Sequence, residues 1–81
     1  MRLEHTKNIT RAIRTFPIEI QEAFYKQTEY LRKNIRHPSL RAKKYGGTDD
    51  VWQARVTDNI RFYFQIVGDS YLLLNIRKHP K

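Results

Sequence analysis

The sequence of 81 residues contains no cysteine, only three glycines and three prolines, and no long apolar run. The absence of cysteine excludes disulfides, thiolate zinc sites and thiol nucleophiles, and a reducing, cytoplasmic setting suits such a chain. No stretch resembles a signal peptide or reaches the roughly 18 apolar residues of a membrane span, so we expect no membrane partner. Repeats and low-complexity tracts are also missing. We therefore expect one small domain over residues 1–81, stabilised by packing alone.

Acidic residues are scarce as well. Sixteen lysines and arginines stand against eight aspartates and glutamates, which gives a net charge of +8. The apolar content of 40%, with one tryptophan, five tyrosines and four phenylalanines, argues against disorder. Such an excess of positive charge indicates a polyanionic partner such as a nucleic acid, although a merely solvated basic surface is the alternative.

Helical spacing dominates the first half of the chain. Residues 1–5 alternate and predict a short edge strand. Thr6 is a suitable N-cap for a helix over residues 7–16, whose apolar positions follow the helical period: Ile9, Ala12, Ile13 and Phe16. A second helix is predicted from Pro17 to near His37–Pro38, with Ile20, Phe24, Leu31 and Ile35 on its apolar side.

After Pro38 the period changes to two. Residues 39–50 are predicted to be a loop in which Gly46–Gly47 forms a turn, and alternation predicts strands over 51–57, 60–67 and 71–78. The resulting order β-α-α-β-β-β predicts an α+β fold, in which a helical hairpin packs on a small antiparallel sheet.

Alternation also divides each predicted strand between two faces of the sheet. The face that would meet the helices carries Trp52, Ala54, Val56, Ile60, Phe62, Phe64, Ile66, Leu72, Leu74 and Ile76. The opposite face, expected to be open, carries Gln53, Arg55, Arg61, Tyr63, Gln65, Tyr71, Leu73, Asn75 and Arg77.

Pairing residues of the same face brings three arginines into one row. If Val56 faces Ile60, Arg55 lies opposite Arg61, and if Ile66 faces Leu72, Arg61 lies opposite Arg77. No strand supplies an acid to this row, and like charges opposite each other destabilise a sheet by about some tenths of a kcal/mol per pair. We therefore expect Arg61→Gln to stabilise the fold and to weaken binding of RNA.

Such a row is typical of a phosphate-binding face. Arginine binds phosphate through a bidentate fork, and Tyr63 and Tyr71 would lie beside the row as stacking platforms for bases. The alternative is that the three guanidinium groups only extend into water.

Histidine is the candidate for proton transfer near neutral pH. His79 follows the last strand and can reach the rim of the arginine row, whereas His37 and His5 fit structural or surface roles better. No residues have the spacing of a metal site or of a serine hydrolase triad, so neither metal nor cofactor is predicted. Arginines and a histidine can cleave RNA without a metal, by stabilising the attack of a ribose 2′-hydroxyl on the adjacent phosphate.

Four segments carry a family resemblance: HPSLRAKKYGG from His37, VWQARV from Val51, NIRFYFQI from Asn59 and LLLNIRKH from Leu72. In their order and spacing they resemble the RelE/ParE toxin superfamily. The resemblance implies a toxin of a type II toxin–antitoxin module that is bound by a cognate antitoxin. Any contact with operator DNA would be made only through that antitoxin. For RelE-type toxins it further implies cleavage of mRNA in the ribosomal A site, beside ribosomal RNA.

The resemblance also implies roles for individual residues. Arg61 matches the phosphate-stabilising arginine, Arg55 a basic position before it, and His79 the general acid. The residues expected to contact RNA are Lys43, Lys44, Arg77, Lys78 and Tyr63.

Two departures from the RelE pattern keep other functions open. Gln53 stands where RelE has a lysine, and no tyrosine follows the last predicted strand. The alternatives are a non-catalytic ParE-type toxin that acts on a protein such as gyrase, or a detoxified remnant that only binds antitoxin.

Overall fold

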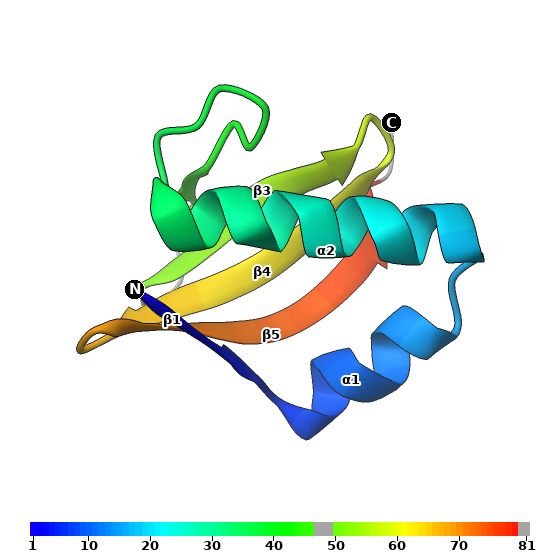
Figure 1. Ribbon diagram of the computed structural model, residues 1–81, viewed down its shortest axis with the longest axis horizontal. Helices are drawn as coiled ribbons and strands as arrows, with labels where there is room; N and C mark the ends of the chain where they lie inside the picture. The colour runs from blue at the N-terminus through cyan, green and yellow to red at the C-terminus, as the bar shows by residue number, and fades with distance from the viewer. Residues whose placement is uncertain (47–49, 80–81) are drawn as a thin grey trace.

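Two helices cover one face of a five-stranded sheet in the computed structural model (Figure 1). The structure describes residues 1–46 and 50–79. In chain order the elements are β1 (Arg2–His5), α1 (Lys7–Arg14), α2 (Ile18–Lys33), β2 (Lys43–Lys44), β3 (Val51–Thr57), β4 (Ile60–Val67) and β5 (Ser70–Lys78). The sheet order is β1-β5-β4-β3-β2, and only β1 and β5 run parallel. The predicted α+β class and the N-terminal edge strand are confirmed.

The start of α1 is fixed by Thr6, as predicted. Its hydroxyl accepts a hydrogen bond from the backbone N–H of Ile9 at 3.2 Å and donates to the carbonyl of Leu73 at 2.9 Å. The cap therefore also fastens the helix to β5, against which α1 packs. Helix α2 packs on β3, whereas α1 packs on β5. The two helices predicted to form a hairpin therefore lie on the same face of the sheet but over different strands.

Helix α2 ends at Lys33, several residues before the predicted end. Asn34 has an extended backbone, with φ −163° and ψ 109°, and its side-chain oxygen accepts the N–H of Arg36 at 3.0 Å. Asparagine ends a helix in this way because its side chain competes for backbone donors. Ile35 still packs against the core, but from the loop.

The predicted loop 39–50 contains the two-residue strand β2, in which Lys43 pairs with Gln53 and Lys44 with Trp52. A strand this short has no readable alternation, which is why the sequence did not predict it. Of the predicted Gly46–Gly47 turn, Gly47 lies outside the described residues.

The predicted arginine register is confirmed: Arg55 lies opposite Arg61, and Arg61 opposite Arg77. The pairings assumed to produce it are wrong, because each hairpin contains a register shift. Ile60 pairs with Thr57 rather than Val56, and Ile66 pairs with Tyr71 rather than Leu72.

The shift in the β4–β5 hairpin corrects the predicted faces of β5. Tyr63 pairs with Asn75, yet the next residue, Phe64, pairs with Leu73, so Leu74 is an extra residue. An extra residue reverses the alternation beyond it. Tyr71 and Leu73, expected on the open face, are therefore 5% and 0% exposed in the core.

The core between the helices and the sheet is built around aromatic rings. Phe24 of α2 meets Phe62 of β4 edge-to-face at 5.6 Å between ring centroids, and Phe64 meets Tyr71 in the same manner at 5.5 Å.

Neither helix of the described segments has the length and apolar character needed to cross a bilayer.

One buried side chain connects α2 to the loop and the sheet. The amide nitrogen of Gln27 donates to the carbonyls of Ser39 at 3.1 Å and of Arg55 at 2.8 Å, and its oxygen accepts from the Ser39 hydroxyl at 3.0 Å. Gln27 is 7% exposed, so these groups have little access to water as a substitute partner.

We expect Gln27→Leu to lower the free energy of unfolding by about 1–3 kcal/mol, because it keeps the volume but removes the partners of two carbonyls. Urea denaturation would measure the loss. Glu22→Ala, an exposed change on the same helix, is the control and should stay within about 0.5 kcal/mol of the wild type. An equal effect of both variants would contradict the bridging role.

Burial raises the pKa of the Tyr71 phenol above its ordinary value of 10.0. The unfolded chain therefore loses this proton first, so the stability contribution is fully present below about pH 10 and is lost as the pH rises through the raised value. We expect the unfolding free energy of the wild type to fall more steeply than that of Tyr71→Phe between about pH 9 and about pH 11. Urea denaturation across that range tests this, and parallel curves would contradict it.

Candidate functional site

The three arginines of the row lie on adjacent strands, but each is engaged by a different partner. Arg55 Nη2 donates to Asp58 Oδ1 at 2.6 Å, so an acid of the β3–β4 turn does offset the row, contrary to the sequence prediction. Arg77 lies over the ring of Tyr63, with 4.8 Å from its guanidinium carbon to the ring centroid. The predicted row of unopposed charges is thus partly neutralised.

Arg61, in the middle of the row, is held over the β3–β4 turn. Its Nη1 donates to the carbonyls of Thr57 at 2.6 Å, of Asp58 at 3.1 Å and of Ile60 at 3.2 Å. Backbone carbonyls fix the guanidinium without neutralising it. Because its bonds to the described residues all use Nη1, the Nη2 and Nε atoms make no hydrogen bond within residues 1–46 and 50–79 and can address a ligand there.

The two tyrosines expected to be open stacking platforms are covered. Tyr71 lies in the core, and Tyr63 is 7% exposed because Arg77 lies over its ring and the Tyr45 ring meets it edge-on at 5.2 Å. Burial by these neighbours excludes stacking of a base on either ring in this conformation. Tyr45, at 38% exposed, is the more accessible ring at this position.

Arg61 and His79 line one small polar cavity of about 240 Å³, together with Lys43, Arg41 and Gln53. The backbone N–H of His79 donates to the carbonyl of Asn59 at 2.6 Å, which anchors the end of β5 beside the β3–β4 turn. The described lining contains no carboxylate. A cavity lined by two arginines, a lysine and a histidine has the electrostatics of an anion site.

The other predicted site residues do not line this cavity. Arg55 borders a separate cavity of about 220 Å³ with Lys26, Gln27 and Ser39. Lys44 Nζ lies 3.8 Å from Asp50 Oδ1 at the surface, and Lys78 is an exposed residue paired with Ile60 at the end of β5.

Two lining residues were not predicted. Arg41 has a positive φ of 47°, a left-handed conformation rare for a non-glycine residue. Gln53, expected on the open face and noted as a departure from the RelE pattern, is only 8% exposed, and strand β3 places it across from Lys43. The single signal for Arg41 was its place in a basic run with Lys43 and Lys44.

The remaining histidines have the roles the sequence favoured. His37 stacks flat on Tyr30 at 3.8 Å, and its Nδ1 accepts the backbone N–H of Ser39 at 3.2 Å, whereas His5 is an exposed residue of β1. Within residues 1–46 and 50–79 no group of three or more potential metal ligands of the His, Cys, Asp and Glu types comes together.

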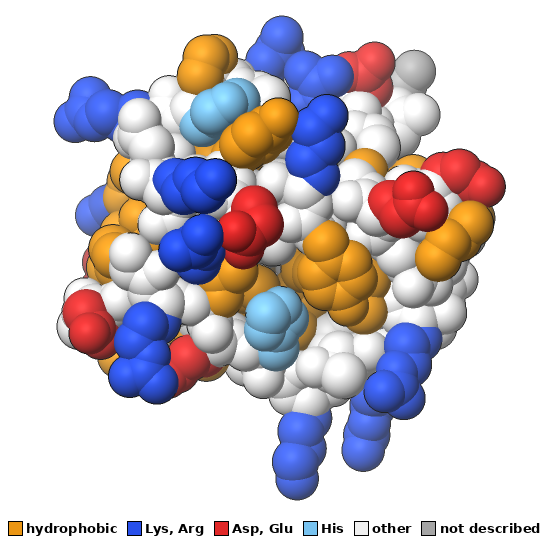
Figure 2. All heavy atoms as spheres, in the orientation of Figure 1, with side chains coloured by type: hydrophobic (Ala, Val, Ile, Leu, Met, Phe, Trp, Pro, Cys, Tyr) orange, Lys and Arg blue, Asp and Glu red, His pale blue; other side chains and the backbone are white. Residues whose placement is uncertain are grey.

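The face of the molecule that carries the helices shows no concentration of one sign of charge like that in the lining of the basic cavity. Figure 2 shows lysine and arginine side chains distributed over that face with acidic side chains and apolar patches between them. A chain with a net charge of +8 therefore does not gather its excess into one basic patch on this side.

Comparison with solved structures shows which fold this is. A YoeB/ParE toxin from Agrobacterium tumefaciens is 15% identical with a TM-score of 0.82, covering 99% of this chain and 100% of the other. The archaeal RelE–RelB complex from Pyrococcus horikoshii is 18% identical with a TM-score of 0.81 (99% and 96% covered), and the intact RelBE toxin–antitoxin complex of E. coli is 13% identical with 0.77 (99% and 98%).

No protein-family model and no curated protein matches the chain. At such low identities the likeness to solved structures concerns the fold, and it extends over nearly the whole chain. The protein therefore has the α+β fold of the RelE- and YoeB-type toxins, as the sequence resemblance implied.

The contacts of Arg61 reverse the stability effect expected from the sequence. Arg61→Gln removes a donor that three carbonyls of the turn share, and it also removes the repulsion between Arg61 and the neighbouring arginines. We expect the loss of the hydrogen bonds to be the larger effect, so that the variant has an unfolding free energy lower by about 1 kcal/mol. Urea denaturation in low and high salt measures both effects. If repulsion prevails, the variant is the more stable protein in low salt and the difference shrinks as salt screens the charges.

Proposed function

We propose that this protein is the toxin of a type II toxin–antitoxin module and that it cleaves mRNA on the ribosome. The observation that carries the proposal is the cavity in which Arg61, His79 and Lys43 meet without a carboxylate among the described lining. Its place on a RelE-type fold supports the same function, since several of the matched structures are described as toxins or toxin–antitoxin complexes.

The cavity has the groups that phosphodiester cleavage requires. Arg61, fixed by the turn carbonyls, would bind a nonbridging phosphate oxygen, and Lys43 would add a second positive charge. Donors fixed before the reaction stabilise the charge that develops in the transition state, an effect of roughly 10²–10³ in rate per donor.

The reaction would proceed by attack of the ribose 2′-oxygen on the adjacent phosphorus. A new P–O2′ bond forms while the P–O5′ bond breaks, which gives a 2′,3′-cyclic phosphate and a 5′-hydroxyl. The 2′-hydroxyl proton passes to solvent, the imidazolium of His79 donates a proton to the leaving 5′-oxygen, and His79 then regains its proton from water.

The partners follow from the same proposal. Several structures of this fold are RelB–RelE complexes, and a cognate antitoxin with an acidic or amphipathic segment would suit a chain of charge +8. Ribosomal RNA beside the mRNA would contact the basic residues outside the cavity, Lys44, Arg77 and Lys78. Arg55 and Tyr63 are engaged by Asp58 and Arg77, so we assign them to positioning the row.

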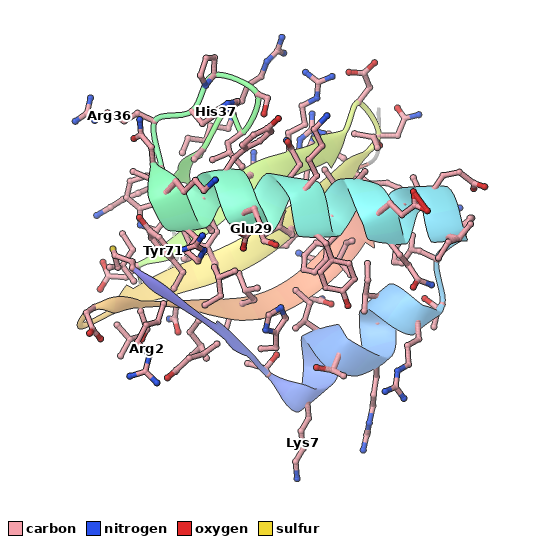
Figure 3. The ribbon with its side chains drawn as sticks, in the orientation of Figure 1. Arg2, Lys7, Glu29, Arg36, His37 and Tyr71 are labelled. Carbon is pink, nitrogen blue, oxygen red and sulfur yellow. The ribbon has the colours of Figure 1, made fainter. Side chains whose placement is uncertain are left out.

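Inducible expression followed by primer extension on translated mRNAs tests the activity. We expect growth arrest with cuts within codons, and a loss of at least about 100-fold in cleavage for Arg61→Ala and for His79→Ala. Lys7→Ala is the matched control, since this exposed base projects from the start of α1, away from the loop that carries Arg36 and His37 (Figure 3). It should cleave as the wild type does.

A gyrase supercoiling assay on the same samples separates the alternatives. Growth arrest with intact mRNA, unchanged in the Arg61 and His79 variants, would contradict the endonuclease, and inhibited supercoiling would then identify a ParE-type toxin. Folding of every variant is verified by urea denaturation, so that loss of activity is not confused with unfolding.

A further inference from the structure

One side chain of the basic cavity has no part in the reaction described above. Gln53 lines the cavity with the two arginines, the lysine and the histidine, and it is 8% exposed. A glutamine amide buried to this degree normally has hydrogen-bond partners within the protein, as Gln27 has in Ser39 and Arg55. The Gln53 amide, in contrast, makes no hydrogen bond within residues 1–46 and 50–79.

The unpartnered amide of Gln53 faces the free space of the cavity. Among the described residues, no side-chain nitrogen or oxygen that is fully enclosed lacks a partner. The amide of Gln53 is therefore accessible from the cavity rather than enclosed in the core. A polar group in such a place loses free energy unless a molecule that enters the cavity supplies its partner. The amide is thus available to a ligand.

Gln53 also differs in hydrogen-bonding chemistry from the rest of the described lining. The guanidinium groups of Arg41 and Arg61 and the ammonium group of Lys43 only donate hydrogen bonds. His79 also only donates when it is the imidazolium that the proposed reaction requires. The carbonyl oxygen Oε1 of Gln53 is then the only side-chain acceptor in the described lining. Its partner on a ligand has to be a donor, such as a hydroxyl group.

The register of the sheet places Gln53 beside the arginine assigned to the phosphate. Gln53 pairs with Tyr63, and Arg55 pairs with Arg61, so Gln53 and Arg61 are diagonal neighbours on one face. Diagonal neighbours on paired strands lie about 7–8 Å apart. In RNA the 2′-hydroxyl is on the carbon next to the one that bears the 3′-phosphate. A phosphate bound by Arg61 would therefore bring this hydroxyl toward Gln53.

The backbone fixes the surroundings of Gln53 before a ligand arrives. Lys43 of β2 pairs with Gln53, and the Leu40 carbonyl accepts the N–H of Arg55 at 2.8 Å. Between these two fixed points Arg41 keeps its φ of 47°, which suits glycine better than arginine and persists because both flanks are held. Fixed groups lose less entropy on binding and hold a ligand in one geometry.

We propose that Gln53 Oε1 accepts a hydrogen bond from the 2′-hydroxyl next to the scissile phosphate, and that this contact selects RNA over DNA and orients the attacking oxygen. The inference rests on the proposed function for the identity of the ligand as RNA. The 2′-hydroxyl is the group by which a protein distinguishes the two nucleic acids. An amide is not a base near neutral pH, so Gln53 takes no proton and the hydroxyl proton still passes to solvent.

Short RNAs that differ at one substituent test the contact. The probes are fluorescein-labelled trinucleotides of uridine and of adenosine, in which the first two sugars carry a 2′-hydroxyl, 2′-fluorine or 2′-hydrogen. Fluorine keeps the sugar pucker of RNA but donates no hydrogen bond. We expect the hydroxyl form to bind about tenfold more tightly than the fluoro form in fluorescence anisotropy, with either base. Parallel titrations of His79→Ala, which cannot protonate the leaving oxygen, keep cleavage from interfering.

Two variants of Gln53 and one control assign the preference to the amide. Gln53→Leu keeps the volume but removes the acceptor, so we expect the preference for the hydroxyl to fall within about twofold of none, with a urea midpoint no lower than that of the wild type. Gln53→Glu keeps an acceptor and should keep the preference, while its negative charge weakens binding of all three forms. Gln65→Leu, the same change outside the described lining, should bind as the wild type does.

Equal affinity of the wild type for the hydroxyl and fluoro forms would overturn the contact, and this comparison needs no variant to fold. A preference that persists in Gln53→Leu would also overturn it. If Gln53→Leu alters the preference between uridine and adenosine instead, the amide contacts a base edge and the inference is wrong.

These outcomes are distinct from those that concern cleavage. Cleavage of mRNA without a 2′-hydroxyl preference in binding removes the inference and leaves the proposed function standing. A preference that Gln53→Leu abolishes, without any cleavage of mRNA, keeps the contact and removes the endonuclease.

Discussion

The hydrogen bonds of the Gln27 amide are the constraint on which the rest of this molecule depends. They tie α2 to the carbonyls of Ser39 and Arg55, and the adjacent bond from the Arg55 N–H to the Leu40 carbonyl closes the same junction. Because the loop is held at this point against β3, the residues that follow it enter the sheet edge in one register. The basic cavity takes Arg41 from this loop, so the junction that these bonds hold also positions part of its lining.

The electrostatic design differs from a simple stripe of positive charge. Of the three aligned arginines, one is paired with a turn aspartate and one lies over an aromatic ring. The third, Arg61, is bound only by backbone carbonyls in the described contacts, and these orient a guanidinium while leaving its charge intact. The Arg61 guanidinium therefore brings an unneutralised positive charge to the lining of the cavity that it shares with Lys43 and His79.

Local signals in the sequence were sufficient for most of the secondary structure and for part of the site. The Thr6 cap and the edge strand were predictable, because capping and alternation act over a few residues. The pairings of Arg55, Arg61 and Arg77 agree with the prediction, although the hairpin pairings from which they were predicted are wrong. The proximity of Arg61 and His79 was also predictable, because the end of β5 must lie beside the β3–β4 turn, from which β4 begins. The early end of α2 and strand β2 were missed, because they depend on contacts with Asn34 and β3 rather than on period.

What the sequence by itself determined is the α+β order, since it follows from the change of hydrophobic period along the chain. The alignment of the three arginines agrees with the prediction, but it also depends on the register shift in each hairpin, which no local pattern showed. The tertiary structure alone decided which residues share a cavity. The extra residue Leu74 turned Tyr71 inward, neighbouring side chains covered Tyr63, and the fixed flanks of Arg41 forced its left-handed backbone. Bulges and strained residues are settled by packing against distant parts of the chain, and no local pattern encodes that packing.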